Sequence, residues 1–163
     1  MSLSAILRYL AIWSLVGASA FSLVVAFLFR SGVVYAARNE TGHLKKEMPL
    51  KGVLSMLAFL CLIVGFLAAT NYFGLTVNGI RLNFVPLFLL NLSLMLILIV
   101  FDSLVIDWWV IGIWRPEFLN LPDEMDKPQM KEHLHRTLLA GPVFALLLAL
   151  FASLVSYYGW MQP

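Results

Sequence analysis

Four stretches of about 20 residues that carry no charged side chain constrain this sequence more than any other feature. A helix needs roughly 20 apolar residues to cross a hydrocarbon core about 30 Å thick, because a backbone group left unpaired in hydrocarbon is costly. These stretches predict membrane spans at about 9–29, 52–73, 82–106 and 137–158, the third continuing past a single carboxylate. We therefore expect an all-α integral membrane protein, with four transmembrane helices in one bundle that forms a single domain over residues 1–163.

Composition excludes several other classes of protein. Of the 163 residues, 61% are hydrophobic and only 12% are charged, which is far too apolar for a soluble globule or a disordered chain. A net charge of +2 offers no surface that would neutralise nucleic-acid phosphates. The one cysteine, Cys61, excludes an internal disulfide and a thiolate zinc site.

The first span also resembles a secretory signal. Arg8 precedes the apolar stretch, and Ala18-Ser19-Ala20 resembles a cleavage site. Apolar sequence continues to Phe29, however, which completes one full span. We interpret the segment as an uncleaved anchor.

The distribution of lysine and arginine predicts the orientation. With four spans, the two termini and the second loop share one side of the membrane. The loops at about 30–51 and 107–136 share the other side, and they carry nine of the eleven basic residues: Arg30, Arg38, Lys45, Lys46, Lys51, Arg115, Lys127, Lys131 and Arg136. Because basic loops stay in the cytoplasm, we expect both long loops inside, both termini outside, and a plasma (inner) membrane location.

The third span is too long for one perpendicular crossing. From Leu82 to Trp114 a helix would measure about 50 Å, so it must tilt strongly, project inward or bend onto the membrane surface. Its end carries Trp108, Trp109 and Trp114, which favour the layer of the inner headgroups. We therefore expect an inward or interfacial extension of the third helix.

Three residues of this span form a candidate polar or proton site: Asn91, Asp102 and Asp107. On an α-helix Asn91, Asp102 and Trp109 share one face, and an amide within a span seeks a partner across a helix interface. Asp102 has two interpretations, an inner boundary marker or an intramembrane carboxylate that needs a proton or cation. Asp107 is expected to be an interfacial, solvated carboxylate.

Histidines near the third loop suggest a metal hypothesis. Asp102, Asp107, His133 and His135 are ligand types that zinc, manganese or iron accept. Against it, His133 and His135 would point to opposite sides of a regular helix. A haem held by His43 with one of these histidines is a further alternative. No motif indicates a cofactor, so the sequence leaves cofactors unknown.

Small residues recur at helical spacing and predict where the helices pack. Because helices in lipid approach closely through small side chains, these stripes indicate bundle contacts, or alternatively an oligomer seam or pore lining. The residues are Ser14, Ala18 and Ser22 in the first span, Cys61, Gly65 and Ala69 in the second, and Ala145, Ala149 and Ser153 in the fourth. Gly141 and Pro142 predict a kink, which is either a packing irregularity or a hinge.

Three functions are compatible with these features. The sequence contains no phosphate-binding glycine motif, nucleophile elbow or His-Glu-x-x-His zinc helix. It therefore favours a non-catalytic subunit or accessory protein of a membrane complex, in contact with the lipid bilayer and with a protein partner or a second copy of itself. The alternatives are an oligomeric proton- or cation-coupled transporter or channel that uses Asp102, and a metal-dependent membrane enzyme with an Asp/His site.

Overall fold

A computed structural model of the chain describes residues 2–30, 50–119 and 127–161. The side chains of residues 51, 52, 55, 56, 127–134, 136 and 138 are outside this description. Within these limits all regular structure is helical. The loop expected at about 30–51, with His43 and Lys45, lies almost wholly outside the described residues.

Four long α-helices form the body of the protein. They are α1 (Leu3–Arg30), α3 (Leu50–Gly74), α4 (Phe84–Phe101) and α5 (Lys127–Ser156). Each provides a segment long and apolar enough to cross a bilayer. This confirms the expected all-α membrane protein with four transmembrane helices. Shorter helical elements are η1 (Thr76–Asn78), η2 (Asp102–Trp114), η3 (Glu117–Leu119) and η4 (Tyr157–Met161).

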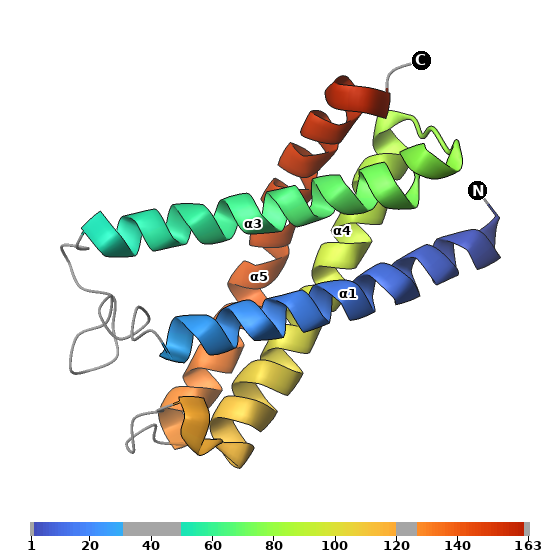
Figure 1. Cartoon of the computed structure of the whole chain (residues 1–163). Helices are drawn as coiled ribbons and strands as arrows, with labels where there is room; N and C mark the ends of the chain where they lie inside the picture. The colour runs from blue at the N-terminus through green and yellow to red at the C-terminus, as the bar shows by residue number, and fades with distance from the viewer. Residues whose placement is uncertain (1, 31–49, 120–126, 162–163) are drawn as a thin grey trace.

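The helices form two crossing pairs. In Figure 1, α4 and α5 run beside each other, and α1 and α3 cross over them. Both chain ends and the turn between α3 and α4 lie at one end of the molecule, which we call the termini end. The end of α1, the start of α3 and the η2–η3 region lie at the opposite end, the loop end.

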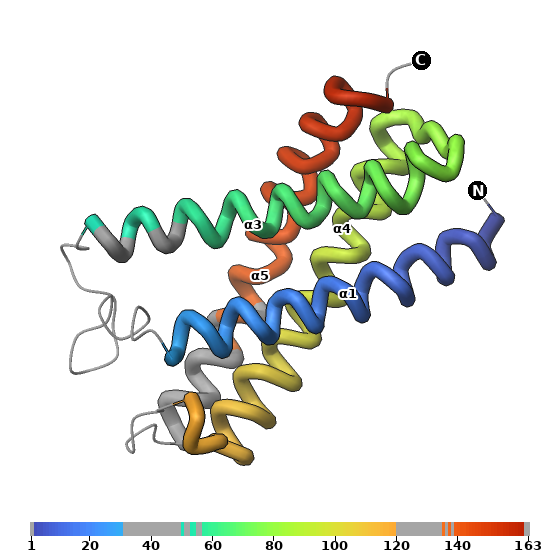
Figure 2. The backbone as a smooth tube through the Cα atoms, viewed as in Figure 1, coloured from blue at the N-terminus to red at the C-terminus, as the bar shows by residue number. Residues whose placement is uncertain are grey.

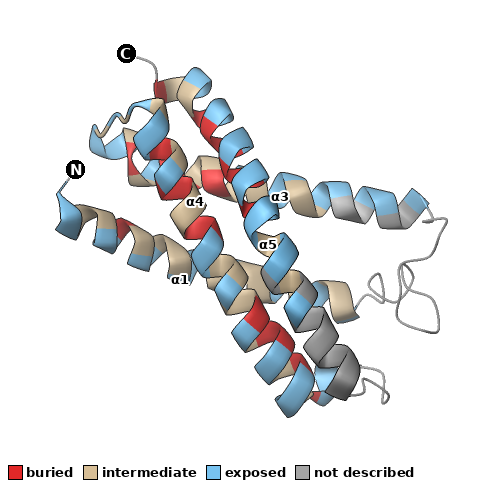
Figure 3. Cartoon of the chain, turned by 180° about the vertical axis from the view of Figure 1, so that it is seen from behind, coloured by how far each residue is buried: buried red, intermediate tan, exposed pale blue. Residues whose placement is uncertain are grey.

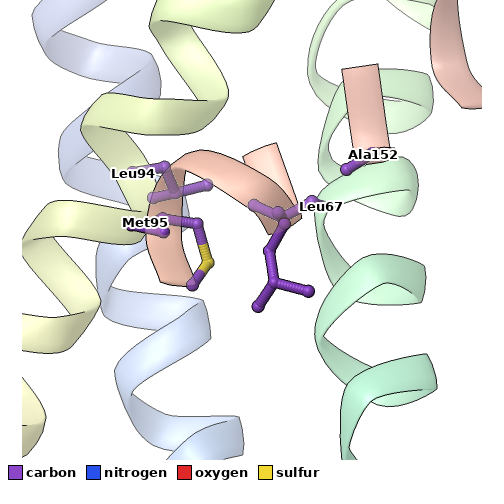
Figure 4. Packing of buried hydrophobic residues seen from close by; sticks show 6 residues of the cluster. Leu67, Leu94, Met95 and Ala152 are labelled. Atoms are coloured by element: carbon purple, nitrogen blue, oxygen red, sulfur yellow. The ribbon is translucent and has the colours of Figure 1, made fainter. Parts of the chain in front are cut away.

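The most extensive contact joins α4 to α5, with α3 packed beside them. Helices in lipid gain little from hydrophobic burial, so close packing itself must hold this centre together. Alanines on α5 permit that approach, while leucines and a methionine from α3 and α4 fill the space (Figure 4). The cluster consists of Leu67, Leu94, Met95, Ala145, Leu148 and Ala152.

Helix α1 is covered far less than α5. In the most apolar segment of α1 only 6% of the residues are buried, whereas 39% are buried in the most apolar segment of α5. Figure 3 shows the same contrast, with buried positions concentrated on α4, η2 and α5. Gly17 lets α1 approach its neighbours, because a Cβ there would lie 2.8 Å from Phe66 and 3.0 Å from Leu98. Helix α1 also packs through Tyr9 near the termini end and through Phe21, Val25 and Phe29 near η2.

The predicted extension of the third span is present, and within it the helix changes from α-helical to π-helical winding. The tube in Figure 2 shows α4 and η2 as one continuous rod. From Asp102 onward the helix is a π-helix, in which each N–H donates to the carbonyl five residues earlier. The Arg115 N–H donates to the Val110 carbonyl at 2.8 Å, and Arg115 ends the helix with a left-handed φ of 47°.

A tight turn joins α3 to α4 at the termini end. Gly79 adopts a positive φ of 72°, which glycine accepts without steric cost. The Asn78 side chain donates to the Phe73 and Gly74 carbonyls at 3.1 and 3.2 Å, and so caps the end of α3. This short connection joins the end of α3 to the start of α4.

Candidate functional site

Buried hydrogen bonds join three helices at the termini end. Tyr9 of α1 donates its hydroxyl to Thr70 Oγ1 and Asn71 Oδ1 of α3, each at 3.2 Å. Asn71 Nδ2 in turn donates to Ser156 Oγ of α5 at 2.9 Å. Thr70, Asn71 and Ser156 are fully buried, and Tyr9 is 6% exposed. Both ends of the Asn71 amide therefore have a partner.

A second buried bond joins α4 to α5. Asn91 Nδ2 donates to Ser153 Oγ at 2.8 Å, and the Ser153 hydroxyl donates to the Ala149 carbonyl at 2.6 Å. Asn91 therefore points toward α5. Its Oδ1 atom is buried without a hydrogen-bond partner among the described residues, so this amide is only half satisfied.

Asn71 and Asn91 both donate to serines on one surface of α5. We call all the residues joined by these buried hydrogen bonds the polar centre. Ser153 and Ser156 are three residues apart and so are neighbours on that helix. Interhelical hydrogen bonds in membranes contribute about 0.6 kcal/mol on average and about 1.7 at most. The polar centre therefore links all four helices, because α3 and α4 bond to α5 and α1 bonds to α3. Its members are Tyr9, Thr70, Asn71, Asn91, Ser153 and Ser156.

Polar groups at the loop end are separate from this centre. Asp102 is half-buried, Ser103 is fully buried and Asp107 is 9% exposed. Along α4, Asn91 and Asp102 are about 16 Å apart, and the buried residues between them are apolar, Leu94 and Met95. The described part of one copy therefore places these polar groups in two distinct regions.

One sequence expectation about this region is wrong, because Asp107 is buried rather than solvated. Trp109 is 51% exposed and so lies apart from the buried face of Asn91. The physical reason is the change to π-helical winding at Asp102. A π-helix aligns residues five apart, so it moves Asp107 toward the face of Asp102 and shifts all later residues from their α-helical positions.

The described side chains form no cluster of the kind that the metal hypothesis requires. Among them, no three His, Cys, Asp or Glu residues group as metal ligands would. His135 is exposed, whereas the side chain of His133 and the whole of His43 are outside the description. Metal and haem binding by these residues therefore stay sequence predictions.

The predicted packing residues occupy different environments. Ala145 and Ala149 are fully buried on α5. Gly65 is exposed, and no described atom outside its own helix lies within 4 Å of the place a Cβ would take. The half-buried residues of the set are Ser14, Ala18, Ser22 and Ala69.

The proposed hinge lies within an unbroken element, because α5 runs through Gly141 and Pro142. A Cβ on Gly141 would lie 2.9 Å from Ile99 Cγ2. Close approach of α5 to α4 therefore accounts for this glycine.

Most of the polar centre was not among the predicted site residues. Asn71 lies within an apolar run just as Asn91 does, so its amide carried the same signal. Tyr9, Thr70 and Ser156 carried none, because tyrosine and hydroxyl residues are common in membrane helices and their partners lie more than 60 residues away. No protein-family model, curated protein or solved structure matches this chain.

Proposed function

We propose that this membrane protein is a non-catalytic subunit of a membrane complex, and that its partner packs a transmembrane helix against α3. The receiving surface, which we call the α3 face, consists of Ala58, Cys61 and Gly65. All three are exposed, and they follow one another at helical spacings of three and four residues.

The observation that carries this proposal is the environment of Gly65. A glycine inside a helix costs roughly 1 kcal/mol relative to alanine, so its presence suggests a backbone that another helix approaches closely. Gly17 and Gly141 fit this explanation inside the protein, because a Cβ on either would lie less than 3.0 Å from a neighbouring side chain. Gly65 has no such neighbour among the described residues, and a partner helix would supply one.

The described residues also leave the α3 face uncovered. None of those from Leu50 to Phe66 is fully buried, whereas Leu67, Thr70 and Asn71 near the other end of the helix are. Leu60, Ile63 and Val64 pack against the core on another side of α3, so among the described residues the α3 face itself remains available. Small side chains there permit the close approach through which helices associate in lipid.

We further propose a plasma-membrane location with both termini outside. The support is the excess of lysine and arginine in the two loops on the opposite side. In this orientation the half of α3 that carries the α3 face lies toward the cytoplasm. The distance between Asn91 and Asp102 favours a subunit over a transporter that would use both residues within one copy.

Purification in a gentle detergent from the native membrane tests the proposal. The wild-type chain should recover another membrane protein at a fixed ratio, and Gly65→Leu should lose it, because a leucine would separate the two helices. Gly159→Leu is the matched control, since Gly159 is also exposed but lies in the short η4 at the termini end, away from the α3 face.

Three results would contradict the proposal. The first is a wild-type monomer that recovers no other protein, and the second is equal recovery by both variants. The third is a complex that contains only copies of this chain, because self-association would replace the subunit role.

A further inference from the structure

Four aromatic side chains gather where η2 meets η3, and we call them the aromatic corner: Trp108, Trp109, Trp114 and Phe118. Each is more than half exposed, at 52%, 51%, 57% and 56%. The Trp109 and Trp114 rings stack at 5.8 Å, and Trp114 meets Phe118 edge to face at 6.5 Å. Three of the four rings therefore form one continuous apolar surface.

The backbone holds this corner in place. The left-handed conformation of Arg115 ends η2 and changes the direction of the chain. Pro116 and Leu119, which follow it, are buried. The Leu119 N–H donates to the Pro116 carbonyl at 3.0 Å, and η3 packs against α1. The rings are thus displayed on the outside of an ordered turn.

The length of the rod predicts the depth of the corner. The 31 residues from Phe84 to Trp114 extend at most about 46 Å at 1.5 Å per residue. The hydrocarbon core takes up about 30 Å, and the bilayer with its headgroups about 40–45 Å. With Phe84 at one hydrocarbon boundary, next to Asn83 and near Arg81, the opposite headgroup layer begins about 30 Å away and ends at about 35–38 Å. Along an untilted rod Trp108 and Trp109 lie about 36 and 38 Å from Phe84, at this layer, and Trp114 lies at most about 45 Å away. A tilt of about 35°, within the usual range, brings Trp114 to the layer as well.

Side-chain chemistry suits that layer. Tryptophan has an apolar body and one N–H donor, so it prefers the boundary where carbonyl and phosphate acceptors meet acyl chains. We propose that the aromatic corner inserts into the headgroup layer of a phospholipid bilayer and fixes the depth of η2. This contact needs no protein partner, and it places Asp102 at the inner boundary of the hydrocarbon.

Depth-dependent fluorescence quenching tests this proposal on the full chain in phosphatidylcholine vesicles. The protein has five tryptophans, so variants that keep only one are made by changing the other four to phenylalanine. The lipid carries bromine either near the glycerol or near the methyl end of its acyl chains. Variants that keep only Trp109 or only Trp114 should be quenched about twofold or more strongly by the shallow label.

A variant with all five tryptophans changed to phenylalanine and with Phe151→Trp is the matched control. Phe151 is exposed at the middle of the apolar stretch Leu139–Met161, so the deep label should quench a tryptophan there more strongly than the shallow one. Should a single-tryptophan chain fail to fold, Trp108→Phe/Trp109→Phe/Trp114→Phe in the otherwise unchanged protein gives the same information. It should lower the fraction of the emission that the shallow label quenches, because it removes the three tryptophans of the corner.

Three results would overturn the proposal: stronger quenching of Trp109 and Trp114 by the deep label, equal quenching at both depths, or no quenching by either lipid. Strong quenching by aqueous acrylamide together with the last result would show that the corner projects into water. Because only lipid and this chain are present, failure here is distinguishable from failure of the subunit proposal.

Discussion

The same substitution at the two buried asparagines should destabilise the protein at only one of them. Asn71 uses both ends of its amide, accepting from Tyr9 and donating to Ser156. Asn91 makes one bond, to Ser153, and leaves Oδ1 buried without a hydrogen-bond partner among the described residues. Leucine has the same branched shape as asparagine and no polar atoms. It therefore removes the hydrogen bonds of either amide, and at position 91 it also removes the unpaired acceptor.

The magnitudes follow from these contacts. At about 0.6–1.7 kcal/mol for each interhelical bond, Asn71→Leu should lower the free energy of unfolding by about 1–3 kcal/mol. Asn91→Leu loses one such bond but also relieves a buried acceptor, which costs about 1–3 kcal/mol when unpaired. Ser153 keeps its bond to the Ala149 carbonyl. We therefore expect Asn91→Leu to be neutral within about 0.5 kcal/mol, or stabilising.

Reversible unfolding in bicelles, followed by steric trapping or by denaturing detergent, measures both variants. A double-mutant cycle between Asn71→Leu and Ser156→Ala should give a coupling of about 0.6–1.7 kcal/mol. The reasoning is refuted if Asn91→Leu destabilises the protein as much as Asn71→Leu does. Such a result would mean that the Oδ1 atom of Asn91 is satisfied.

Two further predictions use the same unfolding measurement. Tyr9→Phe should lower the free energy of unfolding by about 0.6–1.7 kcal/mol, because it removes the hydroxyl that joins α1 to α3. This loss should be smaller in an Asn71→Leu background. Equal losses in both backgrounds would show that Tyr9 and Asn71 act independently. Gly141→Leu should cost about 1–3 kcal/mol, because its Cβ would lie 2.9 Å from Ile99 Cγ2, whereas exposed Gly159→Leu should change stability by less than about 0.5 kcal/mol. A loss of the same size for both glycines would point to leucine itself rather than to close helix packing.

Charge and hydropathy were sufficient to predict the membrane helices, because crossing a bilayer places a strict demand on length and polarity. The extension of the third span was predictable for the same reason, since 31 residues exceed the bilayer core. Its winding was not. Nothing in the residues from Asp102 to Trp114 signals a π-helix, so the burial of Asp107 was not foreseen.

Partners of buried polar groups were only half predictable. An amide in hydrocarbon must find a bond, which identified Asn91 as facing the bundle, but the partner depends on how helices distant in the sequence cross. Small residues show the same limit. Ala149 and Gly65 carry similar signals in sequence, yet Ala149 is fully buried while Gly65 is exposed.

Site-directed labelling of cysteines in intact cells tests the central claim most directly, namely four membrane crossings with both termini outside. In a Cys61→Ala background, Ser2→Cys and Asn78→Cys report on the termini end, and Lys45→Cys and Lys127→Cys on the two long loops. A maleimide that cannot cross the membrane should label the first two in intact cells and the second two only after permeabilisation. Labelling of Lys45→Cys or Lys127→Cys from outside, or opposite results for Ser2→Cys and Asn78→Cys, would contradict the account.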